Sequence, residues 1–320
     1  MSMNKAPKID FAIGGQAVIE GVMMRSPGFI TVAVRKNSGK IKVKDQTFNG
    51  IGVRIKLFAL PLVRGVVNLF EMMIVGTRML NYSATESLDE EQDKPETSTQ
   101  KVLTTITFAL SIIFALGTSL FMFKFVPLWI TDYLSHSFPI LNEKYILFNM
   151  VDGILKTTFF IAYIGILGMA PSIKRVFQYH GAEHKSIYTY EKGLALTPEN
   201  AAKQSRFHPR CGTSFILIVF MISIFIYTFV PRMETFYGTF ALRVLFLPLI
   251  AGVSYEFLKW SAKYENSPII KILITPGLWF QRLTTKEPDL AQLEVALSAL
   301  SQALELEKLN SAGKKQIDVI

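Results

Sequence analysis

Long apolar stretches alternate with charged and polar segments along the 320-residue chain. Four stretches approach the roughly 20 residues that a helix needs to cross a bilayer: residues 102–123, 157–173, 211–231 and 236–255. The first three carry no charge. The fourth contains only Arg243, which we expect near a helix end or turned toward the other helices. The pattern predicts about four transmembrane helices; the alternative is four buried helices of a large soluble core.

The N-terminal part has the two-residue period of strands. Residues 29–47 alternate apolar and polar positions on both sides of "KNSGK", which predicts a β-hairpin with glycine at its turn. The preceding "IGGQAVIEGVMMRSPG" predicts a short strand whose glycines let the backbone pass close to another element. The predicted fold class is therefore an α-helical integral membrane protein with a small N-terminal β-containing cytoplasmic unit.

Two segments predict helices outside the spans. Residues 61–83 carry a polar stripe at helical spacing, typical of a helix on the membrane surface or of one that turns its stripe toward a site: Arg64, Asn68, Glu71 and Arg78. Leucines at helical spacing in residues 289–310 indicate an amphipathic or partner-binding helix. The predicted units are a β-containing unit (1–60), an amphipathic helix with an acidic linker from residue 84 (61–100), a four-span membrane domain (101–285) and a C-terminal helix and tail (286–320).

Composition and charge agree with a membrane class. Half of the residues are hydrophobic and only 18% are charged. Lysines and arginines number 14 before the first span, 7 in residues 174–210 and 8 from residue 259 onward, but only 3 and 2 in the other two connections. By the positive-inside rule, both termini and residues 174–210 face the cytoplasm, and the protein is a multi-pass protein of the plasma membrane. The N-terminus has no apolar signal core, so we expect no cleavage there.

Metal-binding side chains gather between two of the apolar stretches. In "HGAEH", His180 and His184 are four residues apart and share one helix face, with Glu183 beside them. "SRFHPRCG" adds His208 and Cys211 at the entrance to the next stretch. Imidazole and thiolate ligands favour zinc or a similar divalent ion. The pattern predicts a metal site at the cytoplasmic membrane surface, although hydrogen-bonded histidines without a metal are an alternative.

Two forms of this site are open. If all four side chains bind, the site is closed, tetrahedral and structural. If three bind, the fourth position is free for chemistry, with Glu183 or Glu20 as base and Arg206 or Arg210 neutralising a developing anion. The glycine-rich block near the N-terminus is expected to pack against the histidines and to bring two further side chains to the site, Gln16 and Arg25.

Three blocks carry a resemblance: "GGQAVIEGVMMRSP", "YHGAEHKSIYTYE" followed by "ENA", and "SRFHPRCGTSF". They are similar to the signature blocks of the YqhQ-like family, bacterial multi-pass membrane proteins of unknown function with plastid relatives. The resemblance covers roughly residues 10–285 and implies a metal-dependent enzyme without implying a reaction. The matching positions are Gln16, Glu20, Arg25, His180, Glu183, His184, His208 and Cys211.

Three functions are compared. The first is a membrane hydrolase that uses zinc or a similar ion on a lipid-linked substrate or a membrane protein. The second is a non-catalytic factor for membrane-protein insertion or assembly, with a structural metal. Transport is weaker, because the spans hold few charges beyond a pair such as Asp152 and Lys156. The sequence contains no Walker loop, dinucleotide fingerprint or nucleophile elbow, and its net charge of +9 indicates a lipid bilayer partner, with no nucleic acid.

Overall fold

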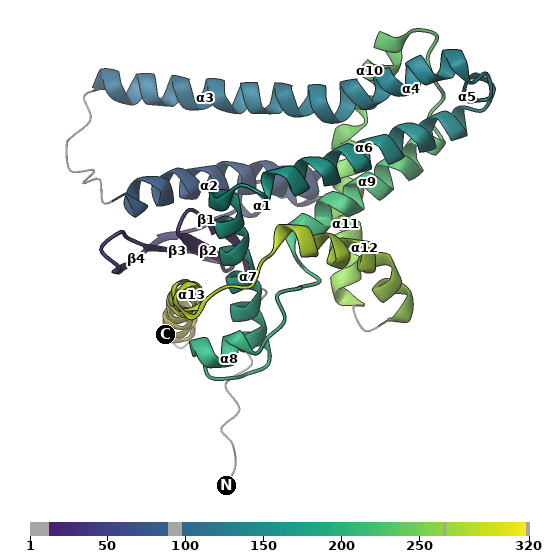
Figure 1. Ribbon diagram of the computed structural model, residues 1–320. Helices are drawn as coiled ribbons and strands as arrows, with labels where there is room; N and C mark the ends of the chain where they lie inside the picture. The colour runs from purple at the N-terminus through teal and green to yellow at the C-terminus, as the bar shows by residue number, and fades with distance from the viewer. Residues whose placement is uncertain (1–12, 89–97, 265–266, 318–320) are drawn as a thin grey trace.

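The computed structural model describes residues 13–88, 98–264 and 267–317. A small sheet lies at one end of the molecule, and long apolar helices extend from it toward the other end (Figure 1). The strands are β1 (Gly14–Val18), β2 (Gly21–Arg25), β3 (Phe29–Arg35) and β4 (Ile41–Thr47). They form one antiparallel meander in the order β1-β2-β3-β4. The predicted hairpin of residues 29–47 is confirmed, and Gly39 takes the positive φ of +83° at its turn.

The sheet is buried on both faces at its central strands. On one face Val22 and Met24 pack against α7 (Pro171–Glu191) and α13 (Leu290–Ile317). On the other face Met23 and Val32 pack against α2 (Val63–Ser87). The predicted helices of residues 61–83 and 289–310 are therefore both present. The partner of α13 in this structure is the chain's own sheet.

The two histidines of residues 180–184 lie on one helix, as their spacing predicts. Helix α7 runs through both histidines, and Gly193 ends the turn after it with a φ of +66°. Thr197 then caps the short helix α8 (Pro198–Ala202) by accepting a hydrogen bond from the backbone N–H of Asn200. Of the acidic linker, residues 84–87 belong to α2 and residues 98–100 to α3, and residues 89–97 lie outside the described part.

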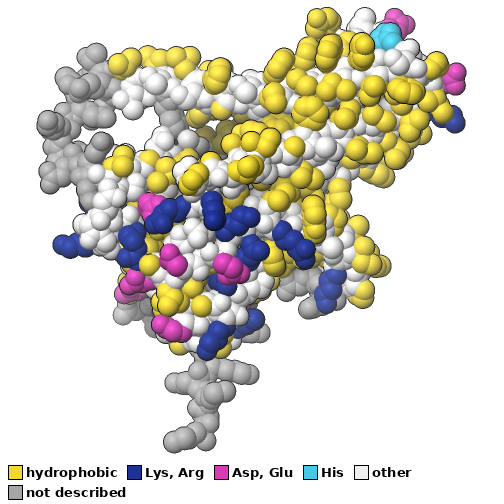
Figure 2. All heavy atoms as spheres, viewed as in Figure 1, with side chains coloured by type: hydrophobic (Ala, Val, Ile, Leu, Met, Phe, Trp, Pro, Cys, Tyr) yellow, Lys and Arg dark blue, Asp and Glu magenta, His cyan; other side chains and the backbone are white. Residues whose placement is uncertain are grey.

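The remaining helices are mostly apolar. In chain order they are α1 (Ile51–Arg54), the 3₁₀ turn η1 (Lys56–Ala59), α3 (Ser98–Leu120), the π-helical turn η2 (Phe121–Phe125), α4 (Val126–Ser137), α5 (Ile140–Glu143), α6 (Tyr145–Leu167), α9 (Gly212–Thr228), α10 (Phe236–Leu245), α11 (Leu247–Lys263) and α12 (Pro268–Thr284). In Figure 2 hydrophobic side chains cover the upper helices, and Lys and Arg side chains gather across the middle of the molecule.

In the described part of the chain, two helices are long and apolar enough to cross a bilayer, residues Ala109–Ser137 and Tyr145–Leu167. A third results if α10 and α11, which bend by 40° at their junction, form one span. Helix α9, predicted as a full span, has 17 residues and belongs with the shorter apolar helices. The chain is thus a mostly helical protein whose two or three apolar helices are compatible with a membrane protein.

The second apolar helix begins 12 residues earlier than predicted, at Tyr145 and not at residue 157. The prediction took only the uncharged run as the span and placed Asp152 and Lys156 as a pair at its start. In the structure they form an ion pair along α6, and Arg243 of α10 pairs with the same carboxylate. All three side chains are at most 4% exposed. Because opposite charges are paired, the apolar helix can include them.

Asp152 is the only carboxylate in that cluster, so its removal leaves Lys156 and Arg243 as buried, unpaired charges. We expect Asp152→Ala to lower the free energy of unfolding by about 3–5 kcal/mol. The control is Asp132→Ala, whose pair with Arg232 is 21% and 25% exposed and is worth about 0–1 kcal/mol. Thermal unfolding of the purified protein in detergent measures both. Equal shifts for the two variants would contradict the assigned role of Asp152.

Candidate metal centre

Helix α7 presents His180, Glu183 and His184 on one face and packs its other side tightly. The small residues between the two histidines, Gly181 and Ala182, lie on that packed side of the helix. A Cβ at Gly181 would collide with the backbone carbonyl of Lys286, and Ala182 is fully buried in the core shared with α13. Glycine therefore fixes how close the helix lies to the α12–α13 connection. The rotation of α7 directs its polar side chains inward.

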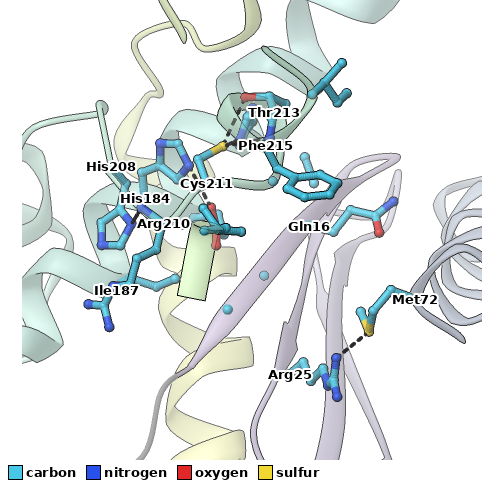
Figure 3. A pocket seen from close by; sticks show the side chains of 18 of the residues that line it. Gln16, Arg25, Met72, His184, Ile187, His208, Arg210, Cys211, Thr213 and Phe215 are labelled. Carbon is cyan, nitrogen blue, oxygen red and sulfur yellow. Dashed lines mark hydrogen bonds and ion pairs between the residues drawn. The ribbon is translucent and has the colours of Figure 1, made fainter. Parts of the chain in front are cut away.

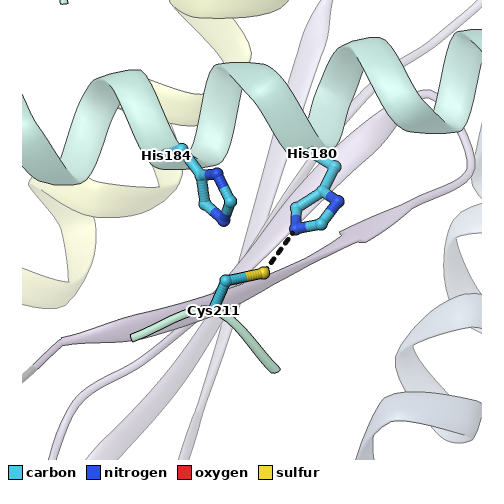
Figure 4. Close-up of side chains that lie close together, drawn as sticks. All are labelled: His180, His184 and Cys211. Carbon is cyan, nitrogen blue, oxygen red and sulfur yellow. Dashed lines mark hydrogen bonds between the residues drawn. The ribbon is translucent and has the colours of Figure 1, made fainter. Parts of the chain in front are cut away.

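Three potential ligands converge at one point. Cys211 stands at the N-terminus of α9, and its Sγ lies 3.2 Å from Nε2 of His180. His184 completes the group: one ligand atom from each of the three side chains lies within 4.8 Å of the others. Figure 4 shows both imidazoles facing the sulfur from the same side of α7. His184 and Cys211 are buried, and His180 is partly buried.

Backbone carbonyls fix the tautomers of both imidazoles. Nδ1 of His180 lies 2.8 Å from the carbonyl oxygen of Thr284, and Nδ1 of His184 lies 2.5 Å from that of Arg206. A carbonyl only accepts, so each Nδ1 must carry the hydrogen and donate it. Each Nε2 then keeps its lone pair, directed to the space beside Cys211. Burial also lowers the pKa of His184, although its hydrogen bond with Cys211 opposes the shift, so its neutral form is favoured.

Glu183 is buried beside this group and touches the N-terminal block. Its Oε2 lies 3.4 Å from Nε2 of His184. Gly15 lies directly against it: a Cβ there would come within 2.6 Å of Cγ and 2.7 Å of Oε1 of Glu183. Burial raises the pKa of this carboxyl, opposed by the nearby histidines and by the Gly15 N–H. A carboxyl whose pKa is raised by burial holds a proton more readily than an exposed one, which suits a group that accepts and returns protons.

The structure does not bring His208 to the same point. Its ring is centred 5.7 Å from that of His184, and its Nε2 lies 3.4 Å from a carboxylate oxygen of Glu191. Gln281 of α12 holds the backbone of His208 on both sides, accepting from its N–H and donating to its carbonyl. Arg210 pairs with Glu191 and lies beside the group. The closed arrangement of four ligands is therefore not formed.

Two other expected residues lie elsewhere. The carboxylate of Glu20 pairs with Arg175 and accepts from the hydroxyl of Tyr179 at 3.3 Å, so it serves the junction of the β1–β2 turn with α7. Arg206 donates to the backbone carbonyl of Thr285 and lies 3.5 Å from Glu287, and it does not line the cavity at the site. In both cases a nearer partner for the charge explains the difference.

A cavity of about 720 Å³ adjoins the group (Figure 3). His180, Glu183, His184 and Cys211 lie at one side of it. Gln16 and Arg25 of the N-terminal block also line it, as the sequence suggested, together with Arg210 and His208. In Figure 3 Arg25 stands at the far end of the cavity, with Gln16 between it and the cysteine. This volume is in the range of small-molecule sites.

Sequence reasoning did not find the contribution of α12. The Thr284 carbonyl orients His180, and Gln281 holds the segment that carries His208. Backbone carbonyls have no sequence signature, so the first contact was not predictable. Gln281 did give a signal in the sequence, because it is an uncharged polar residue in the apolar stretch "LITPGLWFQ". In the structure its side chain is fully buried. A lone buried amide of this kind needs hydrogen-bond partners.

Comparisons with known proteins agree on one family. The sequence model of the family described as "Protein of unknown function (DUF1385)" matches residues 60–306. The chain is 36% identical to "Uncharacterized protein YqhQ" of Bacillus subtilis (strain 168) over 327 aligned positions, which cover 98% of each chain. No solved structure gives a significant match.

The contact of Gly15 with Glu183 gives a matched pair of variants. A Cβ at Gly15 would also lie 2.8 Å from the carbonyl oxygen of Met23, whereas one at Gly14 meets nothing within 4 Å. We expect Gly15→Ala to displace the Glu183 side chain and to lower the free energy of unfolding by about 1–3 kcal/mol. Gly14→Ala should leave it nearly unchanged. Thermal unfolding in detergent distinguishes them, and two neutral variants would contradict the close packing.

Proposed function

We propose that this chain, which belongs to the DUF1385 family, is a zinc-dependent hydrolase of the plasma membrane with its metal centre at the cytoplasmic surface. The ligands would be Nε2 of His180, Nε2 of His184 and Sγ of Cys211. The observation that carries the proposal is the convergence of two imidazole lone pairs, each fixed by a carbonyl at Nδ1, on one buried thiol.

The donor set suits zinc. Two nitrogens and one sulfur are ligands that zinc prefers, and histidine ligands of metal sites typically donate their other N–H to a carbonyl or carboxylate. Here both Nδ1 atoms have that second contact. Without an ion, the His180 imidazole and the thiol of Cys211 gain only a weak hydrogen bond at this point. The geometry therefore supports a divalent ion better than a hydrogen-bonded cluster.

An open coordination position favours catalysis over a structural role. Structural zinc sites usually have four protein ligands, whereas catalytic sites have three. In the described part of the chain, the group contains three potential ligands, and His208 contacts Glu191 instead. A bound Zn²⁺ ion would supply Lewis-acid activation of water and of a carbonyl or phosphoryl oxygen. The Glu183 carboxylate would accept the proton of the water at an Oε atom and return it to the leaving group.

The membrane assignment rests on the apolar helices and on the distribution of charge. The loops rich in lysine and arginine alternate with poor ones along the chain, so we infer that both termini and α7 face the cytoplasm. The band of Lys and Arg side chains beside the apolar helices supports a membrane boundary at that level (Figure 2). The metal centre would then lie on the cytoplasmic side of this boundary and close to it, within reach of molecules held in the bilayer.

Cysteine labelling tests the orientation. Ile140 in α5 is exposed, and Ser301 in α13 is exposed on the sheet side of the molecule. In intact cells, we expect a membrane-impermeant maleimide to react with Ile140→Cys and not with Ser301→Cys, and with both after permeabilisation. The native Cys211 is buried and provides the background signal. Labelling of Ser301→Cys in intact cells would reverse the orientation.

Metal analysis of purified variants tests the ligand set. We expect about one zinc ion per chain in the wild type and a loss of at least about tenfold in affinity for His184→Ala and Cys211→Ser, because each removes a ligand. The matched control is His208→Ala, which should keep the ion because His208 lies outside the group of three ligands. An equal loss of metal affinity in His208→Ala would support the closed site with four ligands. It would then favour a structural metal and the assembly-factor interpretation.

In the same preparations, Glu183→Gln should keep the ion and lose hydrolysis of long-chain chromogenic esters and phosphates by about 100-fold or more, as expected for a missing general base. An active Gln variant would exclude Glu183 as the base.

A further inference from the structure

One arginine of the cavity lacks a carboxylate partner. Among the arginines whose side chains the structure describes, the exposed Arg175 and Arg210 form ion pairs, and so do the other buried or partly buried ones: Arg35, Arg64, Arg206, Arg232 and Arg243. Arg25 forms none. Its Nη1 donates to the sulfur of Met72 at 2.8 Å, and its guanidinium lies 4.4 Å from the ring centroid of Phe48.

These two contacts satisfy the guanidinium only weakly. A thioether sulfur is a poor acceptor, and an aromatic face replaces little of the hydration that burial removes. The nearest carboxylate in electrostatic terms is Glu71, which raises the pKa of Arg25 against the larger, lowering effect of burial. Glu71 nevertheless directs Oε1 to the backbone N–H of Ile51 and does not line the cavity. Among the described residues, this cation of the cavity therefore has no charged hydrogen-bond partner, and an anionic group of a bound molecule could supply one.

The walls of the cavity are largely apolar, although Gln16 lies between Arg25 and Cys211. Leu69 and Met73 of α2, Phe177 of α7 and Ile216 of α9 line the cavity there. The outer side of α2 also exposes apolar side chains, with Phe70 57% and Ile74 41% exposed. A helix with apolar residues on both its cavity side and its outer side is suited to lie at the membrane surface and to let an alkyl chain pass from the bilayer.

We propose that the cavity binds an amphipathic molecule with an alkyl chain and an anionic head, the head contacting Arg25 and the chain lying on the apolar walls of α2, α7 and α9. The inference rests on the proposed function only for the chemistry at the histidine end of the cavity, where the bound molecule would reach His180, His184 and Cys211. Binding itself needs Arg25 and the apolar walls, and it does not need the metal.

Photo-crosslinking tests head and chain separately. The full-length protein in detergent is irradiated with a palmitic acid analogue that carries a diazirine on its chain, and adducts are mapped by peptide mass spectrometry. Two probes are controls: the corresponding alcohol, which lacks the anionic head, and a diazirine analogue of butyric acid, which lacks the long chain. We expect cavity adducts on peptides of α2 and α9, such as those with Met73 or Ile216, from the palmitic acid analogue alone.

Variants then assign the head to Arg25. Arg25→Gln should reduce cavity adducts by about tenfold, the loss expected for one charge-assisted hydrogen bond. Arg25→Lys should restore part of the labelling, which excludes simple misfolding as the cause. Arg78→Gln is the control, because Arg78 of α2 is an exposed arginine that does not line the cavity.

The outcomes separate this inference from the zinc centre. Undiminished labelling in His184→Ala is expected, even if that variant has lost its metal. Equal labelling by the alcohol would overturn the anionic head, equal labelling by the short acid would overturn the alkyl chain, and adducts confined to the exposed face of α3 would overturn the cavity as the binding site.

Discussion

Helix α7 passes the α12–α13 connection so closely that only glycine fits at position 181. The same connection supplies the Thr284 carbonyl for His180, and the backbone N–H of Lys286 donates to the carbonyl of Phe177 one turn earlier on α7. This contact sets the rotation of the helix, and the rotation decides which side chains meet Cys211. The donor atoms are thus held by backbone geometry, which changes little when side chains move, and such preorganisation is what a metal centre requires.

The apolar half of the molecule follows a different constraint. Its charged groups are placed so that they neutralise one another, with one aspartate between Lys156 and Arg243. Tyr227 of α9 donates its hydroxyl hydrogen to the backbone carbonyl of Arg243, which ties a third helix to the pair. Polar groups therefore connect α6, α9 and α10 at defined points, where apolar contacts alone would fix the relative positions of the helices less specifically.

Local patterns in the sequence were enough for the hairpin, for helices α2, α7 and α13, and for half of the site. Period-two alternation identified the hairpin, and the i, i+4 spacing with a nearby cysteine identified His180, His184 and Cys211 as a group. Charge rules failed where opposite charges pair in the fold. They shortened α6 at Lys156, which pairs with Asp152 one turn earlier, and they drew Glu20 and Arg206 toward the centre, although Arg175 and Glu287 were nearer partners. The separation of His208 from the group depends on Gln281, 73 residues away in the chain, and no local pattern contains that information.

Helix α13 closes the face of the sheet that carries Gly15, and it does so with contacts that join the two ends of the chain. The hydroxyl of Thr31 donates to the carbonyl of Ala299, and Ser26 donates to Glu307, 281 residues later. During synthesis the sheet emerges first and the apolar helices follow. The helix that covers the sheet, α13, is made last. Thr284, whose carbonyl orients His180, is likewise made after both histidines and Cys211, so the candidate centre is completed only when synthesis has passed α12.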